Sequence, residues 1–260
     1  MKRDQQTIDS RHAAMTALVN ERQSIKVDEL ASLFDVSLMT VRRDLQILED
    51  KGLLKRIHGG AESLSASGGS ANALANNKIM ISAYMASLIQ NGDSLFMNGS
   101  LTALNSLLFL EGKNVKVITN NGKAVDMDFP DNINILLTGG ILKDHIMVGD
   151  FAIRNLLQSR ADKAIIGCTG ISPAGEIMCA VPSELSVNEF MHSHAKEYFI
   201  VVDSSKIGRT GTYASVSLES SGTIITDEEA DRSVLEQLKA RGMKVITVSH
   251  GPDGIVGTEL

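Results

Sequence analysis

Hydrophobic positions near the start of the chain follow a helical period. Residues 27–52 place apolar side chains three and four positions apart, interrupted by a polar turn at residues 35–37. We expect a short amphipathic helix before the turn and a second helix after it, capped by the Ser37 hydroxyl and ended by Gly52. The pattern therefore predicts a helix-turn-helix.

The second helix separates an apolar stripe from a polar face. At about 100° per residue, Val41, Leu45 and Leu48 fall on one side, which we expect to be buried. Arginine and glutamine on the other side are suited to base edges and phosphates, although a plain solvated face would have a similar composition. The candidate DNA-binding residues of this segment are Ser37, Met39, Thr40, Arg42, Arg43 and Gln46.

Residues 53–61 decide between these alternatives. They form two short extended runs around a basic stretch, and Gly59 and Gly60 permit a tight turn between the runs. Such a wing would lay Lys55, Arg56 and His58 along a phosphate backbone. This combination favours double-stranded DNA as the partner.

These residues also carry a resemblance. Val41-Arg42-Arg43-Asp44-Leu45, Gly52-Leu53-Leu54 and His58-Gly59-Gly60-Ala61 resemble the DNA-binding head of the DeoR-type family of bacterial sugar-metabolism repressors. The resemblance implies a transcription regulator that binds an operator, more often as a repressor.

Around this motif we expect a small N-terminal domain and a linker. Residues 10–21 predict a first helix with Ala14, Leu18 and Met15 facing inward, and residues 1–61 then form a winged helix-turn-helix. Residues 62–77 are small and polar without a periodic apolar face. We interpret them as a linker that is flexible at Gly68 and Gly69.

From residue 78 the pattern alternates between helices and short β-rich runs. Alternation of this kind predicts a larger α/β domain, residues 78–248, with a mostly parallel sheet. We expect residues 249–260 to be a loose tail. The expected helices are 78–90, 102–110, 151–159, 183–194 and 231–241, and the expected strands are 94–97, 115–119, 134–138, 163–167, 197–202, 223–226 and 244–248.

Small residues, amides, hydroxyls and one lysine follow the predicted strands. Because ligands of open α/β sheets gather at the carboxyl ends of strands, this rim is suited to a small, polyhydroxylated, anionic ligand. Glycines there would let backbone N–H groups approach a phosphate. The candidate effector-binding residues are Asn98, Ser100, Thr102, Asn120, Gly139, Gly140, Asp203 and Lys206.

The rim extends the resemblance to nearly the whole chain. Asp203-Ser204-Ser205-Lys206-Ile207-Gly208 and Ile225-Thr226-Asp227 resemble the DeoR-type sensor domain, which belongs to the ribose-5-phosphate isomerase and CoA-transferase fold group. The resemblance implies a phosphorylated sugar or a derivative as effector. Residues 98–102 depart from the family's Asp-x-Gly-Thr-Thr, because the carboxylate is replaced by the amide of Asn98 and one hydroxyl by Leu101.

Several residues invite a catalytic interpretation. Lys206 beside Asp203 could act as an isomerase pair, so a sugar-phosphate isomerase-like enzyme with a DNA-binding head is the alternative function. We expect a regulator and no enzyme, because a tethered DNA-binding head needs a sensor rather than turnover. For Glu184 we expect only a favourable interaction with a helix N-terminus.

The remaining reactive side chains predict no cofactor and no metal site. Cys168 has no neighbouring base in the sequence, and we expect it and Cys179 to be free thiols. His192 and His194 are two positions apart on a predicted helix and would point to different faces. Gly139 and Gly140 lack the spacing of a dinucleotide fingerprint.

Charge and hydropathy complete the picture. The net charge is −6, but residues 1–65 contain ten Lys or Arg and ten Asp or Glu, so all the excess acid lies in the body. No apolar run is long enough for a membrane span, and the N-terminus does not resemble a signal peptide, so we expect a cytoplasmic protein. Since one head has a small interface with DNA, we also expect a homo-oligomer, either a dimer or a tetramer.

Overall fold

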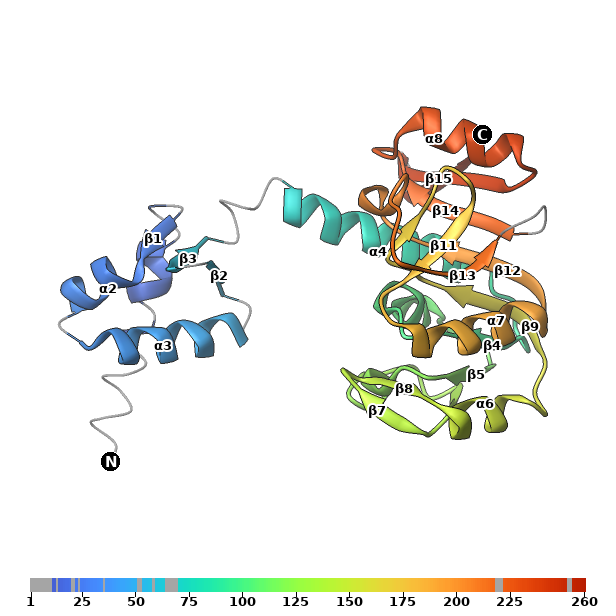
Figure 1. Ribbon diagram of the computed structural model, residues 1–260, viewed down its shortest axis with the longest axis horizontal. Helices are drawn as coiled ribbons and strands as arrows, with labels where there is room; N and C mark the ends of the chain where they lie inside the picture. The colour runs from blue at the N-terminus through green and yellow to red at the C-terminus, as the bar shows by residue number, and fades with distance from the viewer. Residues whose placement is uncertain are drawn as a thin grey trace. The chain divides into compact units, whose positions relative to one another are not determined.

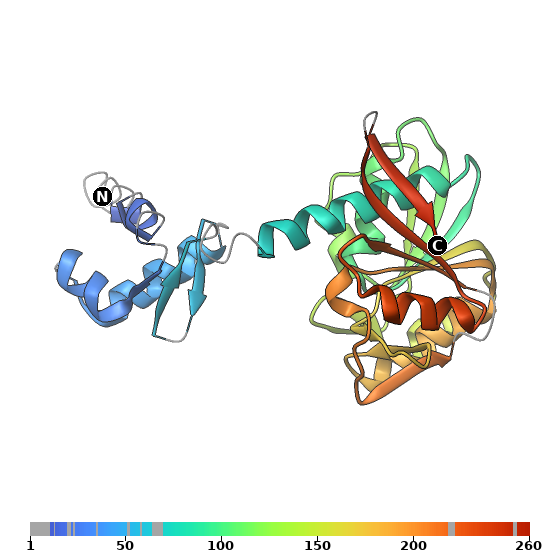
Figure 2. The same ribbon diagram turned by 90° about the horizontal axis from the view of Figure 1, so that it is seen from above.

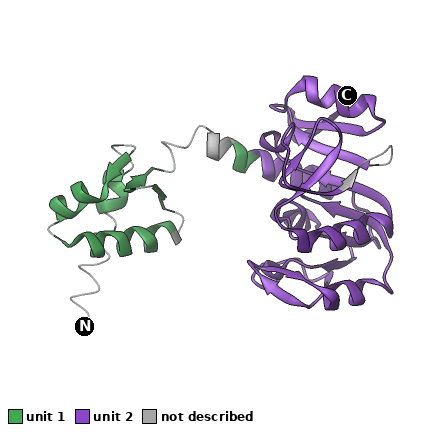
Figure 3. Cartoon of the chain, viewed as in Figure 1, with its two compact units in different colours: residues 1–76 green, residues 77–260 purple. Residues whose placement is uncertain are grey.

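The computed structural model describes residues 11–12, 14–19, 22, 24–34, 36–50, 53–57, 59–63, 70–217, 222–251 and 254–260. The chain forms two compact units, residues 1–76 and residues 77–260, which Figure 3 shows in different colours. The division falls within helix α4 (Ser70–Leu88). Each unit has a hydrophobic core of its own.

The first unit is a winged helix-turn-helix head. Residues 11–12 and 14–19 are helical, and they precede β1 (Ser24–Lys26), α2 (Val27–Phe34), α3 (Leu38–Asp50), β2 (Lys55–Ile57) and β3 (Gly60–Glu62). Strand β3 pairs antiparallel with both β1 and β2. β1 is not predicted by the sequence pattern, because three residues are too few to display an alternation.

Helix α3 is held to the head by the predicted stripe. Val41, Leu45 and Leu48 are buried in one core with residues of the first helix, α2 and the strands. The prediction for the first helix was wrong in one respect, since Ala14 is exposed whereas Met15 and Val19 are buried. Met15 and Val19 are four positions apart and share one helical face, and Ala14 is rotated away from it.

The second unit is built on an eight-stranded sheet with the order β16-β15-β14-β12-β9-β4-β5-β6. All neighbouring strands are parallel except β15 and β16. The α/β architecture with a mostly parallel sheet is therefore confirmed, and in Figure 1 the sheet runs from β15 beside α8 to β5 beside the hairpin of β7 and β8. The strands are β4 (Ser94–Met97), β5 (Val115–Thr119), β6 (Ile133–Leu137), β9 (Ala161–Ile166), β12 (Ala195–Val201), β14 (Gly222–Asp227), β15 (Lys244–Gly251) and β16 (Gly254–Glu259).

Helices cover both faces of this sheet because successive side chains of its strands point to opposite faces. On β4, Phe96 enters one core, while Leu95 and Met97 enter the other. The core around Phe96 is completed by α6 (Asp150–Leu156), α7 (Leu185–Ser193) and α8 (Arg232–Ala240). The other core is completed by α4 and by α5 (Leu101–Asn105), which continues into a 3-10 helix, η1 (Ser106–Phe109).

Two stretches differ from the prediction. Within residues 62–77, which we interpreted as a linker, Glu62 belongs to β3 and α4 already begins at Ser70; residues 64–69, including Gly68 and Gly69, lie outside the described residues. The small and alanine-rich residues 71–75 have a high helix propensity even without an amphipathic pattern. The predicted loose tail is wrong for the described residues 249–251 and 254–260, which form the end of β15 and the edge strand β16; Figure 2 shows β16 running to the C-terminus.

Two smaller features were not predicted from the sequence pattern. β7 (Ile141–Lys143) and β8 (Ile146–Val148) form a hairpin. β10 (Gly170–Ile171), β11 (Glu176–Cys179) and β13 (Tyr213–Ser217) form an antiparallel sheet.

Among the described helices, none has the length and apolar character needed to cross a membrane.

Candidate functional site

Helix α3 presents a polar, solvent-exposed face opposite its buried stripe. Arg42, Arg43 and Gln46 are exposed, and Met39 is 72% exposed. At the start of the helix, the Thr40 backbone N–H donates to the Ser37 hydroxyl at 3.1 Å, as the sequence predicted for the cap. The helix is therefore anchored on one side and open on the other.

The wing is tied to α3 by Arg56. Its guanidinium donates to the Gln46 side-chain carbonyl, and its backbone N–H donates to the Glu49 carboxylate at 2.8 Å. A hollow of about 310 Å³ lies between the wing and α3, and Arg42 and Arg56 both line it. Two guanidinium groups at one concave surface are suited to a phosphate. Lys55 is exposed, and His58 lies outside the described residues.

The orientation of α3 is reinforced by a buried ionic network. Asp44, which is 4% exposed, accepts hydrogen bonds from the Arg11 guanidinium at 2.8 Å and pairs with the His12 ring at 3.0 Å. Burial alone would raise the pKa of Asp44, but these bonds from Arg11 and His12 hold it below its usual value. The carboxylate therefore connects the recognition helix to the first helix.

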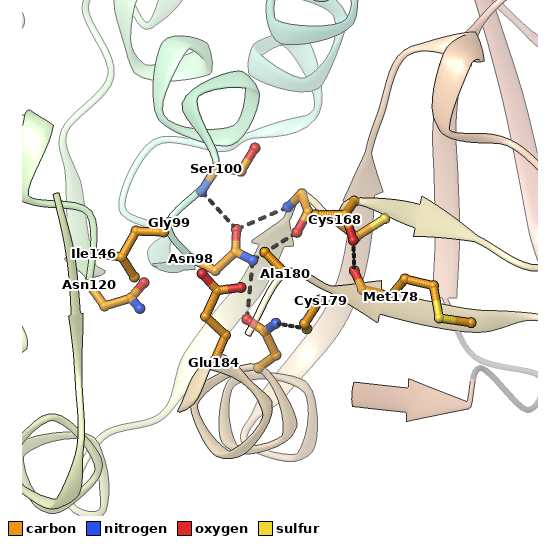
Figure 4. Close-up of a pocket in the computed structure, with 13 residues that line it drawn as sticks. Asn98, Gly99, Ser100, Asn120, Ile146, Cys168, Met178, Cys179, Ala180 and Glu184 are labelled. Carbon is orange, nitrogen blue, oxygen red and sulfur yellow. Dashed lines mark hydrogen bonds between the residues drawn. The ribbon is translucent and has the colours of Figure 1, made fainter. Parts of the chain in front are cut away.

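In the body, a cavity of about 200 Å³ opens where β4, β5 and β9 end, and it is closed on the other side by β11 and by the start of α7 (Figure 4). It contains three of the predicted effector residues, Asn98, Ser100 and Asn120. The other lining residues are Gly99, Ile146, Gly167, Cys168, Thr169, Met178, Cys179, Ala180, Glu184 and Asn188.

The hydrogen-bonding groups of the Asn98 side chain are all paired within the protein. Its Nδ2 donates to the Gly167 carbonyl at 2.8 Å and to Asn188 Oδ1 at 3.1 Å, and its Oδ1 accepts from the backbone N–H groups of Ser100 and Gly167. An asparagine amide has two donor hydrogens and two acceptor lone pairs, so all four are used. Asn98 therefore shapes the cavity by joining the loops after β4 and β9 to α7.

In the side chain of Asn120, the amide nitrogen has a hydrogen-bond partner and the carbonyl oxygen has none in the part of the chain that the structure describes. Its Nδ2 donates to the Met147 carbonyl at 3.1 Å, an interaction that sets the orientation of the amide because a carbonyl accepts only from a donor. Its Oδ1 is buried and has no hydrogen-bond partner among the described residues, and the residue is 1% exposed. A buried acceptor without a partner costs free energy unless a ligand or water supplies a donor.

Ser100 has a double role. Its hydroxyl oxygen accepts from the Ala103 backbone N–H at 3.3 Å and so caps α5, while its O–H hydrogen stays available to the cavity. Gly167 permits this arrangement, since a Cβ at that position would lie 2.0 Å from the Ser100 hydroxyl oxygen. Small residues are needed here for close packing.

Glu184 is the acidic side chain of the cavity. Glu184 is the N-cap residue of α7, as its predicted place at a helix start requires, but its side chain makes no capping hydrogen bond to that helix. Figure 4 shows its carboxylate pointing into the cavity toward Asn120. Burial raises the pKa of Glu184, and a hydrogen bond to the Ala180 backbone opposes that rise. The carboxylate is thus partly desolvated and directed at the space that a ligand would fill.

Neither cysteine has the character of a nucleophile, although Cys179 is buried and Cys168 is partly exposed. Burial raises the pKa of Cys168 to about 12 and also raises the pKa of Cys179, so both are protonated near neutral pH. Both are free, and Cys179 Sγ accepts a hydrogen bond from Asn188 Nδ2 at 3.1 Å. This arrangement gives neither thiol the thiolate character that a nucleophile requires.

The other predicted effector residues lie outside the cavity lining. Thr102 is inside α5, where its carbonyl accepts from the Ser82 hydroxyl. Gly139 and Gly140 form the turn between β6 and β7, and a Cβ on Gly140 would lie 2.6 Å from the Val148 carbonyl oxygen. Gly140 is therefore needed for close packing, and Gly139 for a turn conformation with a φ of +67°.

Asp203 caps a 3-10 helix, η4 (Ser204–Lys206), that follows β12, and Lys206 is the last residue of this helix. The Asp203 carboxylate accepts from the backbone and hydroxyl of Ser205 and lies 3.7 Å from the Lys78 ammonium. Lys206 is close enough to Cys168 to lower the pKa of that cavity residue, against the larger effect of burial. Asp203 thus pairs with Lys78, which weakens the idea of an isomerase pair with Lys206.

Sequence reasoning missed the wall formed by Met178, Cys179 and Asn188. Met178 and Cys179 belong to β11, whose small sheet was not predicted, and Asn188 belongs to a predicted helix but lies on its buried face. A polar residue at a buried helical position was the available signal for Asn188. Among the described residues, no group of three His, Cys, Asp or Glu side chains could hold a metal ion.

Comparisons with known proteins agree with this division into head and body. Residues 11–67 match the model of the DeoR-like helix-turn-helix domain, and residues 74–228 match the model of the DeoR C terminal sensor domain.

Among similar proteins, the HTH-type transcriptional repressor GlcR of Bacillus subtilis is 29% identical over 93% of this chain and 97% of its own length. The glycerol-3-phosphate regulon repressor of Escherichia coli is 28% identical over 88% of this chain and 94% of its own. A solved ribose 5-phosphate isomerase of Methanocaldococcus jannaschii covers 71% of this chain and 78% of its own at 13% identity, with a TM-score of 0.38. With both of its domain models matched, the chain belongs to the DeoR family of transcriptional regulators.

Proposed function

We propose that this regulator represses a carbohydrate-metabolism operon by binding its operator through α3 and the wing, and that a phosphorylated sugar or sugar derivative relieves the repression. The proposal rests chiefly on α3, whose buried Val41, Leu45 and Leu48 leave Arg43 exposed on the opposite face and Arg42 exposed beside it. Arginine at such a position reads guanine or clamps a phosphate. Operator DNA as partner implies that the protein acts in the cytoplasm.

The DNA contacts that we propose divide by chemistry. Arg43, Arg42, Gln46, Met39 and Thr40 face outward on or beside the exposed side of α3 and are suited to base edges or the adjacent phosphates. Ser37 at the helix start and Lys55 and Arg56 on the wing are suited to the backbone. His58 would join this second group.

The effector would bind at the strand-end rim of the body. The residues matched by the family's sensor domain include this rim. A glycerol-3-phosphate regulon repressor and a lactose phosphotransferase system repressor are among the similar proteins. In this proposal Lys206 provides a point charge for the phosphate, and binding changes DNA affinity by the difference in effector affinity between two states, typically about 1–3 kcal/mol.

We also propose that the body associates into at least a dimer, since helix-turn-helix proteins commonly gain affinity by engaging two half-sites. Residues 136–157 contain a concentration of exposed apolar side chains that a second copy of the chain would cover. These side chains are Leu136, Leu137, Ile141, Leu142, Phe151 and Leu157, which are between 40% and 72% exposed.

The proposed function is tested by an electrophoretic screen of the DNA upstream of the gene, with and without pentose, hexose and triose phosphates. We expect a specific shifted band that one metabolite weakens. Lys206→Ala, checked as folded, should need more of that metabolite to release the DNA. A shifted band that no metabolite changes would contradict effector control, and metabolite turnover detected by NMR would favour the isomerase-like alternative.

A further inference from the structure

We propose that the cavity binds the hydroxyl-bearing part of the effector through the Glu184 carboxylate and the Asn120 side-chain carbonyl, and that it excludes the phosphate. This inference rests on the proposed function in assuming that the body binds a small metabolite. It adds that the hydroxyl-bearing part of the effector enters the cavity, and it names the side chains that bind this part.

The cavity is lined by one acceptor without a partner in the described part of the chain, Asn120 Oδ1, and by the Glu184 carboxylate, which is hydrogen-bonded to the Ala180 backbone and has acceptor capacity left. Asn120 Oδ1 is buried without a hydrogen-bond partner among the described residues, and its amide is held in that orientation by the Met147 carbonyl. Glu184 points toward it in Figure 4, with a carboxylate that can accept several hydrogen bonds. Two acceptors that line one cavity favour a ligand group that donates, and vicinal hydroxyl groups meet this need.

The charge of the lining argues against a phosphate. Among the described residues that line the cavity there is no lysine, arginine or histidine, whereas Glu184 is acidic. A phosphate placed beside this carboxylate would be repelled without any compensating cation. The amide of Asn98 cannot compensate, because its hydrogens already bind Gly167 and Asn188.

The cation of the rim lies beside the cavity rather than in it. Lys206 does not line the cavity, but it ends η4 directly after β12, and the neighbouring strand β9 leads into the lining residues Gly167 and Cys168. A sugar phosphate could therefore direct its charged end toward Lys206 and its hydroxyl groups toward Glu184. The volume of about 200 Å³ is smaller than the usual pocket for a drug-sized ligand and suits such a polyol portion.

The test is isothermal titration of the full chain with sn-glycerol 3-phosphate, D-ribose 5-phosphate and D-glucose 6-phosphate, and with inorganic phosphate as the charge-only probe. We expect the wild type to bind at least one polyol phosphate, and Glu184→Ala to weaken that binding by about tenfold or more, as expected for the loss of hydrogen bonds to a charged acceptor. Glu184→Gln, which keeps one acceptor, should lose less. Glu189→Ala removes an exposed carboxylate from the same helix and should bind as the wild type does.

Any of three results would overturn the inference. The first is unchanged affinity in Glu184→Ala, and the second is tighter binding in Glu184→Gln, which would mean that an anion occupies the cavity. The third is that the wild type binds none of the polyol phosphates. Circular dichroism of each variant excludes misfolding as the cause of lost binding. The operator-binding assay separates this inference from the proposed function. If a polyol phosphate binds in a Glu184-dependent way without changing operator affinity, the cavity assignment stands and effector control fails.

Discussion

The DNA-binding face of α3 and the cavity of the body are assembled in opposite ways. The face comes from thirteen consecutive residues, and one helical period determines which of its side chains are buried and which are exposed. The cavity takes side chains from the loops after β4, β5 and β9, from β11 and from the start of α7. Its residues span positions 98–188, and no local period connects them.

This contrast explains which side chains are available to a partner. On α3, an exposed polar residue is free to bind unless another side chain reaches it, as Arg56 reaches Gln46. In the cavity, polar residues first satisfy one another, since buried polar groups are costly without partners. Asn98 is saturated by such bonds, whereas Asn120 and Glu184 retain acceptors.

The largest expected effect concerns the network that orients α3. Asp44→Asn removes a buried charge from between Arg11 and His12 and should destabilise the head by about 3–5 kcal/mol, measured by urea unfolding of the full chain. Because the pKa of Asp44 is lowered in the folded state, its contribution is complete above its usual value of 3.8 and is lost as the pH falls through the folded value. The difference between variant and wild type should therefore shrink below about pH 4, and a difference that is constant down to pH 2 would contradict this account.

The next effect tests the saturation of Asn98. Asn98→Asp would place a carboxylate oxygen next to the Gly167 carbonyl, at a position where Nδ2 now donates over 2.8 Å, and should cost about 2–3 kcal/mol of body stability. Asn134→Asp, at an exposed position of β6, serves as the matched control with little expected change. If the two variants unfold alike, Asn98 is not the structural junction that its hydrogen bonds indicate.

The same two regions show how much could be predicted from sequence. The N-terminal cap, buried stripe and exposed face of α3 were predictable because each depends on residues within a few positions, while Gly52, the predicted end signal, lies outside the described residues. The main strands were also predictable, and so was the carboxyl-end rim. The cavity lining was not predictable from the sequence. It depends on β11 and on whether each side-chain amide is hydrogen-bonded within the protein or directed into the cavity. Gly139, Gly140 and Asp203 have the composition of ligand-binding residues, but the turn at residues 139–140 and the ion pair with Lys78 account for them structurally.

The next effect concerns the proposed association of two bodies into a dimer. Phe151 is 72% exposed, and Phe151→Asp would place a charge in the apolar area that we assign to a second copy. We expect the dimer dissociation constant to rise by an amount equivalent to about 2 kcal/mol or more, as for a central aromatic residue of an interface. Analytical ultracentrifugation measures this, with Asp150→Asn as a neighbouring control. A wild type that is monomeric at micromolar concentration and still binds its operator tightly would contradict the proposed dimer.

A smaller effect is expected at the DNA surface. Arg43→Ala should weaken operator binding by about 1–3 kcal/mol and leave the stability of the head unchanged, since Arg43 is exposed. Fluorescence anisotropy with operator and unrelated DNA separates base contacts from phosphate contacts, because loss of a phosphate contact weakens both alike. Arg160→Ala removes an exposed arginine of the body and should have no effect. Equal operator affinity of folded Arg43→Ala and wild type would refute the assignment.

The most direct measurement is an operator-release titration that compares wild type, Arg43→Ala and Glu184→Ala with the metabolite that acts on the wild type. If α3 binds DNA and the cavity senses the effector, Arg43→Ala will bind operator weakly at every effector concentration. Glu184→Ala will bind operator as the wild type does and will require about tenfold more effector for release. Release of Glu184→Ala at the wild-type effector concentration, or full operator affinity in Arg43→Ala, would contradict the division of roles between the head and the body.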